Sequence, residues 1–325
     1  MGLHTVEPER RTLHGSFSAE LPPILEIEPG DTVRLRTLDA GWNLEPRRST
    51  VYSEQPAKFE PRDDERDAGH ALCGPIAIRG AEPGMTLAVR IDAIRPGRSG
   101  YTVVGGWPHP VNRRLGFEEQ GTFLLWTLDP DALTGRDQYG HTLALRPFMG
   151  VMGMPPAAPG LHSTVPPRVT GGNIDCKELV AGSVLYLPIE VPGALFSVGD
   201  GHAAQGDGEV CVTAIECPME RVDLSFDLER DLHLATPRAY TPAGWITFGF
   251  HEDLDEAMLI ALEAMVELMC ELHGLARQEA FGLASLVVDL RITQVVNEVR
   301  GVHAVLPHGA IEGWESGPGH GVVRR

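Results

Sequence analysis

Two short pairs of polar residues in the middle of the chain have the types and the spacing of metal ligands. Asn173 and Asp175 stand in TGGNIDCKEL, and Asp200 and His202 stand in VGDGHAAQGDGE. In an extended backbone, residues two apart point to the same side, so each pair would project its polar atoms together. Oxygen ligands and one imidazole suit a divalent cation such as zinc, calcium or manganese. On spacing alone a second interpretation stays open, in which Asp200 and Asn173 only accept hydrogen bonds from turn amides.

Three further residues could take part in the chemistry. Glu216 ends the apolar segment EVCVTAIE, where an inward carboxylate needs a cation or a donor, and a raised pKa would suit a general base. His70 precedes ALCGPIAI and could line the mouth of a site, but a lone histidine is also an ordinary strand residue. Cys176, with Lys177 and Glu178 beside it, has the residue types of a Cys-Glu-Lys nitrilase site. Adjacent residues on a strand cannot converge, so we expect water and not a thiolate to be the nucleophile.

Motifs and composition exclude several other classes of protein. The chain contains no GxSxG, HExxH, Walker or GxGxxG motif. A formal net charge of −18 over 325 residues argues against a nucleic-acid partner. The chain has no basic amphipathic helix and no long apolar run of the kind that would indicate binding to a membrane. The five cysteines include no CxxC pair, and the N-terminus lacks the apolar core of a signal peptide, so we expect a cytoplasmic protein.

Three similar segments predict strands that would position these residues. Each has an apolar run, a turn ending in Gly and then period-two alternation, over 24–37, 76–91 and, more weakly, 177–191. Their recurrence favours a β-sandwich or jelly roll made of similar hairpins; unrelated hairpins that share common turn chemistry are the alternative. The segments 105–110 and 152–167 are rich in proline and glycine, and we expect them to be loops that cover a site.

The character of the sequence changes near residue 220. After two strand-like segments, apolar residues over 254–272 recur at steps of three and four, which predicts an amphipathic helix that ends at Gly274. A second helix is expected over 277–290, followed by the strand RITQVVN. The polar, Gly-rich tail from residue 313 is expected to be loose.

These elements together predict the fold class and its division. We expect an α+β protein that is mostly β. Residues 1–220 would form a β-sandwich or jelly-roll-like region that carries the site, and residues 221–325 a smaller α+β region with two helices and a returning C-terminal strand.

Longer blocks of the sequence resemble the acetamidase/formamidase family. The resemblance covers nearly the whole chain, and it is most specific in GGNID and VGDGHAAQGDGE, with further support from LPIEVPGALFSVGDGH, GPIAIRGAEPG and ITQVVNEVRGVHAVLP. It implies hydrolysis of short aliphatic amides to a carboxylic acid and ammonia, and a bound divalent metal. It also implies a β-sandwich-like region joined to a smaller α+β region.

The resemblance favours four residues as ligands of this metal: Asn173, Asp175, Asp200 and His202. Zinc is our first choice of ion, with calcium and manganese as alternatives. A cation at this site would lower the pKa of a bound water from about 15.7 towards about 7. Glu216 would then accept the proton of the attacking water, and His70 or the metal would stabilise the oxyanion.

We expect the ligand of this site to be a small amide and the protein to be a homo-oligomer. Trp107 and Phe148 are candidate walls of a small cavity. Two other functions remain open. One is a metal-dependent hydrolase of a different C–N bond, as in a cyclic amide, a urea or a guanidine compound. The other is a noncatalytic β-sandwich module that binds its ligand without turnover.

Overall fold

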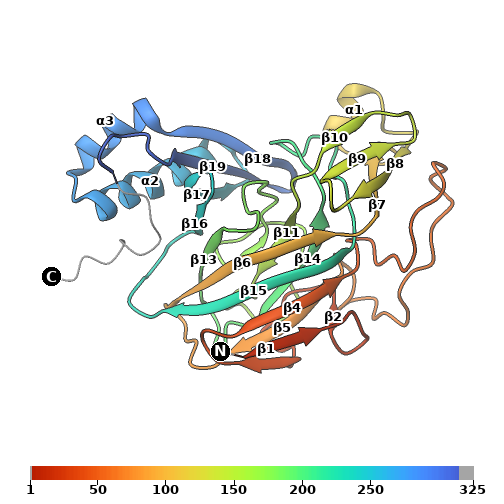
Figure 1. The fold of residues 1–325 in the computed structure, drawn as a ribbon, viewed down its shortest axis with the longest axis horizontal. Helices are drawn as coiled ribbons and strands as arrows, with labels where there is room; N and C mark the ends of the chain where they lie inside the picture. Colours follow the sequence, from red (N-terminus) through yellow and green to blue (C-terminus); the bar gives the residue numbers. More distant parts are fainter. Residues whose placement is uncertain (1, 315–325) are drawn as a thin grey trace.

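The computed structural model describes residues 2–314, which form three β-sheets and three helices (Figure 1). The expected α+β class with mostly β structure is therefore confirmed. The tail that was expected to be loose lies outside the described residues from position 315 onward. No helix within residues 2–314 is long and apolar enough to cross a membrane.

The largest sheet runs through the whole molecule. Its order is β1-β4-β15-β6-β13-β16-β17-β19-β18. The bounds in that order are Leu3–Val6, Thr32–Thr37, Met219–Glu229, Thr86–Pro96, Val184–Pro188, Arg238–Thr241, Gly244–His251, Val299–Pro307 and Asp289–Asn297. The predicted boundary at residue 220 falls inside β15, so one sheet joins the two predicted regions. The division itself stays a prediction.

Two smaller sheets complete the β structure. The six-stranded sheet has the order β12-β11-β14-β5-β2, with β3 beside β5. Its bounds in that order are Gly171–Asn173, Phe148–Gly153, Phe196–His202, Leu72–Ile78, Leu13–His14 and Leu25–Ile27. The four-stranded sheet, β10-β9-β8-β7, comprises Thr142–Ala144, Thr134–Asp137, Thr122–Asp129 and Ser99–Val104.

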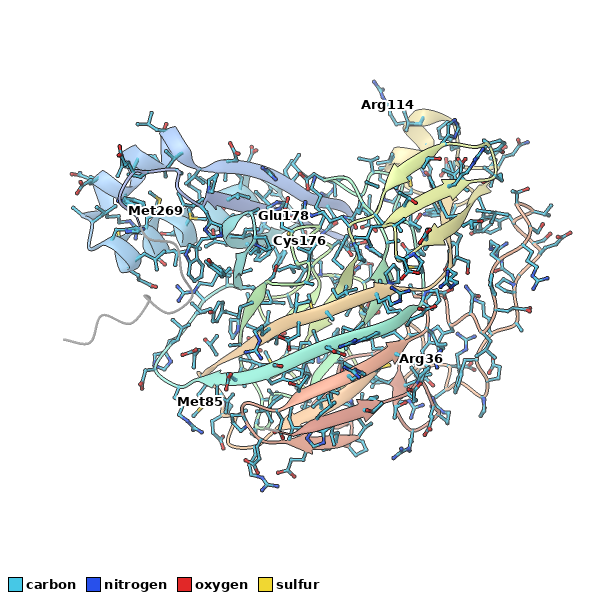
Figure 2. The ribbon with its side chains drawn as sticks, in the orientation of Figure 1. Arg36, Met85, Arg114, Cys176, Glu178 and Met269 are labelled. Atoms are coloured by element: carbon cyan, nitrogen blue, oxygen red, sulfur yellow. The ribbon has the colours of Figure 1, made fainter. Side chains whose placement is uncertain are left out.

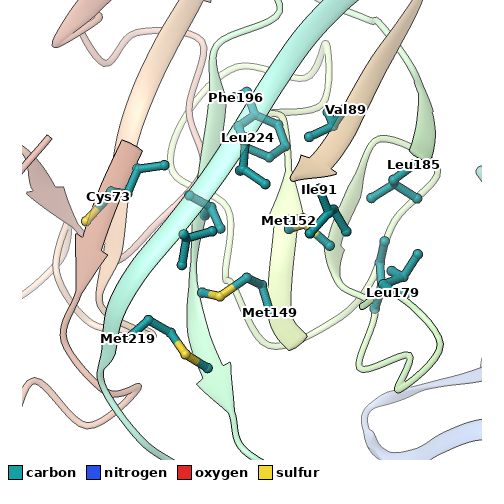
Figure 3. Packing of buried hydrophobic residues seen from close by; sticks show 14 of the residues in the cluster. Cys73, Val89, Ile91, Met149, Met152, Leu179, Leu185, Phe196, Met219 and Leu224 are labelled. Carbon is teal, nitrogen blue, oxygen red and sulfur yellow. The ribbon is translucent and has the colours of Figure 1, made fainter. Parts of the chain in front are cut away.

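The main hydrophobic core lies between the largest sheet and the six-stranded sheet. Figure 3 shows Val89 and Ile91 of β6 and Leu224 of β15 near Met152 of β11 and Phe196 of β14. All five side chains are buried. Burying a side chain of this size contributes roughly 1.5–3 kcal/mol, so this shared interior holds the two sheets face to face. The six-stranded sheet carries three of the candidate site residues, Asn173, Asp200 and His202, and this core fixes its position.

The repeated segments form strands, but they are not hairpins. In the first, β3 belongs to the six-stranded sheet and β4 to the largest sheet. In the second, β5 and β6 are divided between the same two sheets. Only β13 forms in the third segment. The hairpin prediction was wrong because alternation indicates which residues share a face of a strand, and not which strand it will pair with.

The C-terminal helices cover one end of the largest sheet. Helix α2, Leu254–His273, begins after the cap Asp253 and ends at Gly274, which adopts the left-handed conformation. Its buried face packs on β17 and β19, with α3, Arg277–Val287, beside it. Helix α3 ends three residues earlier than predicted, because Val288 is extended and β18 follows at once.

The two proline-rich segments are loops over most of their length. Pro110 instead begins the short helix α1, Pro110–Leu115, where a proline at the first helical position needs no amide hydrogen. Met152 and Gly153 are the last residues of β11, so this loop starts two residues later than predicted.

Candidate active site and metal centre

The site is built around the C-terminal end of β14 and the segment that follows β12. Asp200 and His202 lie on β14, and Asp175 follows β12. Gly150 of β11 lies between them: a Cβ atom there would be 2.6 Å from Asp200 Oδ2 and 2.7 Å from Asp175 Oδ1. Only glycine leaves room for two carboxylates to approach this backbone.

Four buried acidic residues surround one imidazole. His202 Nε2 lies 3.2 Å from Asp200 Oδ1 and 3.3 Å from Glu216 Oε1, and His202 Nδ1 lies 3.9 Å from Asp175 Oδ1. Glu209 completes the group, since its ligand atom lies within 4.8 Å of those of His202 and Glu216. All five side chains are buried. This His/Asp/Glu cluster could hold a metal ion.

The backbone of the site is held in an unusual conformation. Asp175, Asp200 and Glu209 have φ values of 53°, 57° and 45°, and Val212 has a φ of 74°. Residues other than glycine rarely adopt this left-handed region, and a β-branched valine does so at particular cost. Such strain is concentrated at functional sites, where the surrounding structure compensates for it.

Several oxygen atoms of the cluster have no hydrogen-bond partner among the described residues. These buried atoms are Asn173 Oδ1, Asp175 Oδ1, Glu209 Oε2 and Glu216 Oε2. Burying a polar atom without a hydrogen-bond partner costs free energy of folding, and burying an unpaired carboxylate oxygen costs more. Carboxylate, amide and imidazole groups are the donors that a divalent cation takes in proteins. The residues present therefore fit a divalent cation.

The protonation of the cluster responds to this crowding. Burial and, to a smaller extent, the nearby Asp200 carboxylate raise the pKa values of Asp175 and Glu216 to about 7. Burial also raises the pKa of Glu209 well above its usual range, and Asp175 adds to that rise. Burial opposes the charge on His202, yet Glu216 and Asp200 raise its pKa well above the ordinary value. The cluster therefore needs positive charge, as a proton or as a cation.

A shell of amide groups orients these side chains. His202 Nδ1 lies 2.9 Å from Gln205 Oε1, and Gln205 Nε2 donates to the backbone oxygen of Asp175. Because the Gln205 amide oxygen can only accept, Nδ1 carries a hydrogen. Nε2, which faces Asp200 and Glu216, is then the nitrogen that either carries the second proton of the charged ring or binds a cation. Asn297 Nδ2 donates to Asp175 Oδ2 from the end of β18, 122 residues away in sequence.

The structure brings all six predicted site residues together. His70, Asn173, Asp200 and Glu216 line a cavity of about 220 Å³, and Asp175 and His202 lie in the cluster next to it. His70 Nδ1 lies 2.7 Å from Thr164 Oγ1, which orients its ring at the cavity wall. Asn173 and Asp175 do not lie two apart on one extended strand as predicted, because β12 ends at Asn173 and Asp175 has a positive φ.

The two residues predicted to form walls of the cavity, Trp107 and Phe148, do not line it. Trp107 is absent from the described residues that line the cavity. Phe148 is fully buried behind the cluster, with its ring edge-on to His202 at 5.1 Å. The cavity is instead lined by Tyr101, Val103, Val212 and Thr213. These residues come from β7 and from the loop after β14, where no sequence pattern indicated that they would face a site.

Cys176 does not take part in the site. Its side chain is buried in the main hydrophobic core, and burial raises the pKa of its thiol far above the ordinary value. Cys176 and Glu178 are both labelled in Figure 2, close to the C-terminal strands. Glu178 is held there by Arg146 and Arg291, and not by the acidic cluster around His202.

A buried cluster of carboxylates and one imidazole beside a small cavity defines a hydrolase-type site on a mostly β fold. The description "Acetamidase/Formamidase family" belongs to a family model that matches residues 4–163 and 157–310. This chain therefore belongs to the acetamidase/formamidase family, as its sequence blocks indicated.

Individual proteins similar to this chain have names that fit this family. An acetamidase from Mycolicibacterium smegmatis is 29% identical over 254 residues, which cover 61% of this chain and 61% of that protein. A formamidase from Methylophilus methylotrophus is 28% identical and covers 61% of this chain and 59% of that protein. The matched part thus spans about three fifths of the length of these two relatives. The crystal structure of an acetamidase from Bacillus halodurans superposes with a TM-score of 0.78, at 27% identity, over 93% of this chain and 97% of that chain.

Proposed function

We propose that this protein hydrolyses short linear amides, such as formamide and acetamide, to the carboxylic acid and ammonia, with the help of a divalent cation. The observation that carries the proposal is the set of buried, unpartnered oxygen atoms around His202, beside a cavity of about 220 Å³. Family membership supports the reaction class. The small polar cavity supports a small amide as the substrate.

Asp175, Asp200 and His202 would hold the cation, with Asn173 Oδ1 as a further oxygen donor. When bound, such an ion makes a water more acidic and polarises a carbonyl group. Zinc suits the mixture of carboxylate and imidazole, and calcium or manganese would suit the oxygen donors. Gln205 keeps Nε2 of His202 free to bind the ion, because it holds the hydrogen on Nδ1.

Glu216 is the proposed general base. Its Oε1 accepts a hydrogen bond from the backbone amide of Ala214, which fixes the carboxylate, while Oε2 has no partner among residues 2–314. Glu216 would accept a proton from the attacking water as the new C–O bond forms. It would return that proton to the amide nitrogen as the C–N bond breaks and ammonia leaves.

His70 is the proposed donor to the carbonyl oxygen. Thr164 Oγ1 accepts the backbone amide hydrogen of His70 and lies beside its Nδ1. If the Thr164 hydroxyl donates to Nδ1, the hydrogen of the neutral ring is on Nε2, where it can be donated. A donor of this kind typically contributes about 3 kcal/mol to the transition state.

An amide panel combined with elemental analysis tests this proposal. We expect ammonia release from formamide and acetamide, with kcat/KM falling steeply towards butyramide because each methylene must fit a small cavity. Chelation should abolish turnover, and one added divalent ion should restore it. Full activity with less than about a tenth of an equivalent of any divalent ion would contradict the metal role.

The same panel separates the two alternatives. A lactam, urea and a guanidine compound are included, with a primary-amine assay for lactam opening because that reaction releases no ammonia. Turnover of one of these but not of linear amides would indicate another C–N hydrolase. Amide binding in calorimetry with no product from any substrate would indicate a binding module.

A further inference from the structure

Tyr101 lies next to Glu216, a member of the acidic cluster, in the wall of the cavity. It belongs to β7, and its backbone forms an antiparallel bridge with Glu216: Tyr101 N donates to Glu216 O at 3.0 Å, and Glu216 N donates to Tyr101 O at 2.8 Å. Directly bridged residues project their side chains on the same side. Both residues line the cavity that also contains Asp200 and His70.

The phenol oxygen of Tyr101 has one hydrogen-bond partner among residues 2–314. Asn43 Nδ2 donates to Tyr101 Oη at 3.4 Å. The orientation of this amide is set by Asp39, because Asn43 Nδ2 also donates to Asp39 Oδ2 at 3.0 Å, and Asn43 N donates to Asp39 Oδ1. Since the amide nitrogen is a donor only, Tyr101 accepts from it, and the hydrogen of its own hydroxyl is left to donate.

The ring of Tyr101 is fixed in place. It packs edge-on against Phe123 with the ring centroids 6.1 Å apart. Gly41 lies beside the hydroxyl, where a Cβ atom would be only 2.9 Å from Tyr101 Oη. Gly41 and Tyr101 both line this cavity, and Tyr101 also lines a neighbouring cavity of about 200 Å³ together with Asn43 and Asp39. A donor held this firmly needs little reorganisation when a substrate arrives.

We propose that Tyr101 is a catalytic residue whose hydroxyl donates a hydrogen bond to the carbonyl oxygen of the amide as negative charge develops there. This role rests on the proposed amide hydrolysis and adds a second donor to His70. Burial raises the pKa of Tyr101 well above its usual value, with Asp39 and Glu216 adding to the rise, so the phenol keeps its hydrogen at neutral pH.

The test compares Tyr101→Phe with a matched control, Tyr52→Phe. Tyr52 also packs against Phe123, with ring centroids 5.7 Å apart, but its side chain is exposed, and it is not among the described residues lining the cavity. Each protein is assayed with acetamide and with thioacetamide, whose sulfur is a weak hydrogen-bond acceptor. The ratio of the two kcat/KM values, measured on one preparation, does not depend on how much of the protein is folded.

We expect Tyr101→Phe to lower kcat for acetamide about a hundredfold, with KM changed less than about threefold, because the hydrogen bond strengthens in the transition state. The loss for thioacetamide should be less than about tenfold, and Tyr52→Phe should behave as wild type. An equal loss on both substrates, or no loss on either, overturns the role of Tyr101 while the amidase proposal stands. A wild-type protein that hydrolyses no amide overturns both.

Discussion

Strand β14 takes part in two buried histidine sites that differ in one physical respect. Near its start, Ser197 Oγ lies 2.9 Å from His14 Nε2, and His14 Nδ1 donates to the backbone oxygen of Ser16 at 2.7 Å. At its end, His202 lies among carboxylates, three of which have an oxygen with no hydrogen-bond partner within residues 2–314: Asp175 Oδ1, Glu209 Oε2 and Glu216 Oε2. The imidazole rings of His14 and His202 are both buried.

The contrast shows that burial alone does not identify a functional histidine. Both ring nitrogens of His14 have a neutral partner, so burial lowers its pKa to about 4 and the ring stays uncharged. His202 has the opposite shift, because the carboxylates of Glu216 and Asp200 outweigh its burial. A closed hydrogen-bond set indicates a structural role, and a surplus of unpaired acceptors indicates a place for a cation.

The largest difference between the two sites should appear on removal of the imidazole. His202→Ala deletes the one nitrogen ligand of the cluster, so we expect loss of bound metal and a fall in kcat/KM for acetamide of about a thousandfold or more. His14→Ala is the matched control, because it deletes another buried ring, which lies on β2 and contacts Ser197 of the same strand β14. Metal content by elemental analysis and ammonia release give the two readouts.

In the folded fraction of His14→Ala, metal content and kcat/KM should stay within about threefold of wild type. Its cost should instead be a less stable fold, since Ser197 Oγ and the oxygen of Ser16 lose their partner. Full metal content in His202→Ala, or lost metal in folded His14→Ala, would reverse the assignment of the two histidines.

The second prediction concerns the pH dependence of folding. The pKa of His14 is lowered from 6.5 to about 4 in the folded protein, so its contribution to stability is present above pH 6.5 and is lost as the pH falls through 4. The full loss is about 3 kcal/mol. His14→Gln keeps hydrogen-bonding groups but cannot titrate, so its free energy of unfolding should fall less between pH 7 and pH 4.

Urea unfolding at several pH values, monitored by circular dichroism, measures this slope. His303 also has a pKa lowered to about 4 by burial, but it is present in both proteins and cancels from the difference. Parallel pH profiles for wild type and His14→Gln would mean that His14 binds its proton equally well in the folded and unfolded states, so that its site would not be the closed structural site described above.

The sequence predicted the chemical residues of the site better than their surroundings. Asp200 and His202 are two apart on β14, and their side chains meet as predicted, although Asp200 departs from regular strand geometry with a φ of 57°. Glu209 was missed although it stands in the same Gly-rich block, because nothing local shows that its loop folds back on the cluster. Asn297 was missed because its contact with Asp175 depends on the tertiary path of β18.

The fold shows the same limit. Amphipathic periodicity predicted α2 and the alternating strands correctly, since these patterns arise from neighbours in sequence. Sheet membership was not predicted: β3 and β4 are consecutive, yet they lie in different sheets. The prediction of the cavity walls was wrong for the same reason, because Tyr101 and Val212 reach the site only through the tertiary fold.

The smallest effect on activity is expected at Cys176, next to a proposed ligand. Asp175 faces the cluster while the thiol of Cys176 is buried in the apolar core, and burial raises its pKa, so no thiolate is available at neutral pH. Cys176→Ala should therefore keep kcat/KM for acetamide within about threefold, with a loss of stability of about 1 kcal/mol from the small cavity. Cys73→Ala, at an equally buried cysteine of the same core, is the control for that loss. If folded, metal-loaded Cys176→Ala lost about a thousandfold in activity, covalent catalysis by the thiol would replace the attack of water, and the open acceptors around His202 would need another explanation.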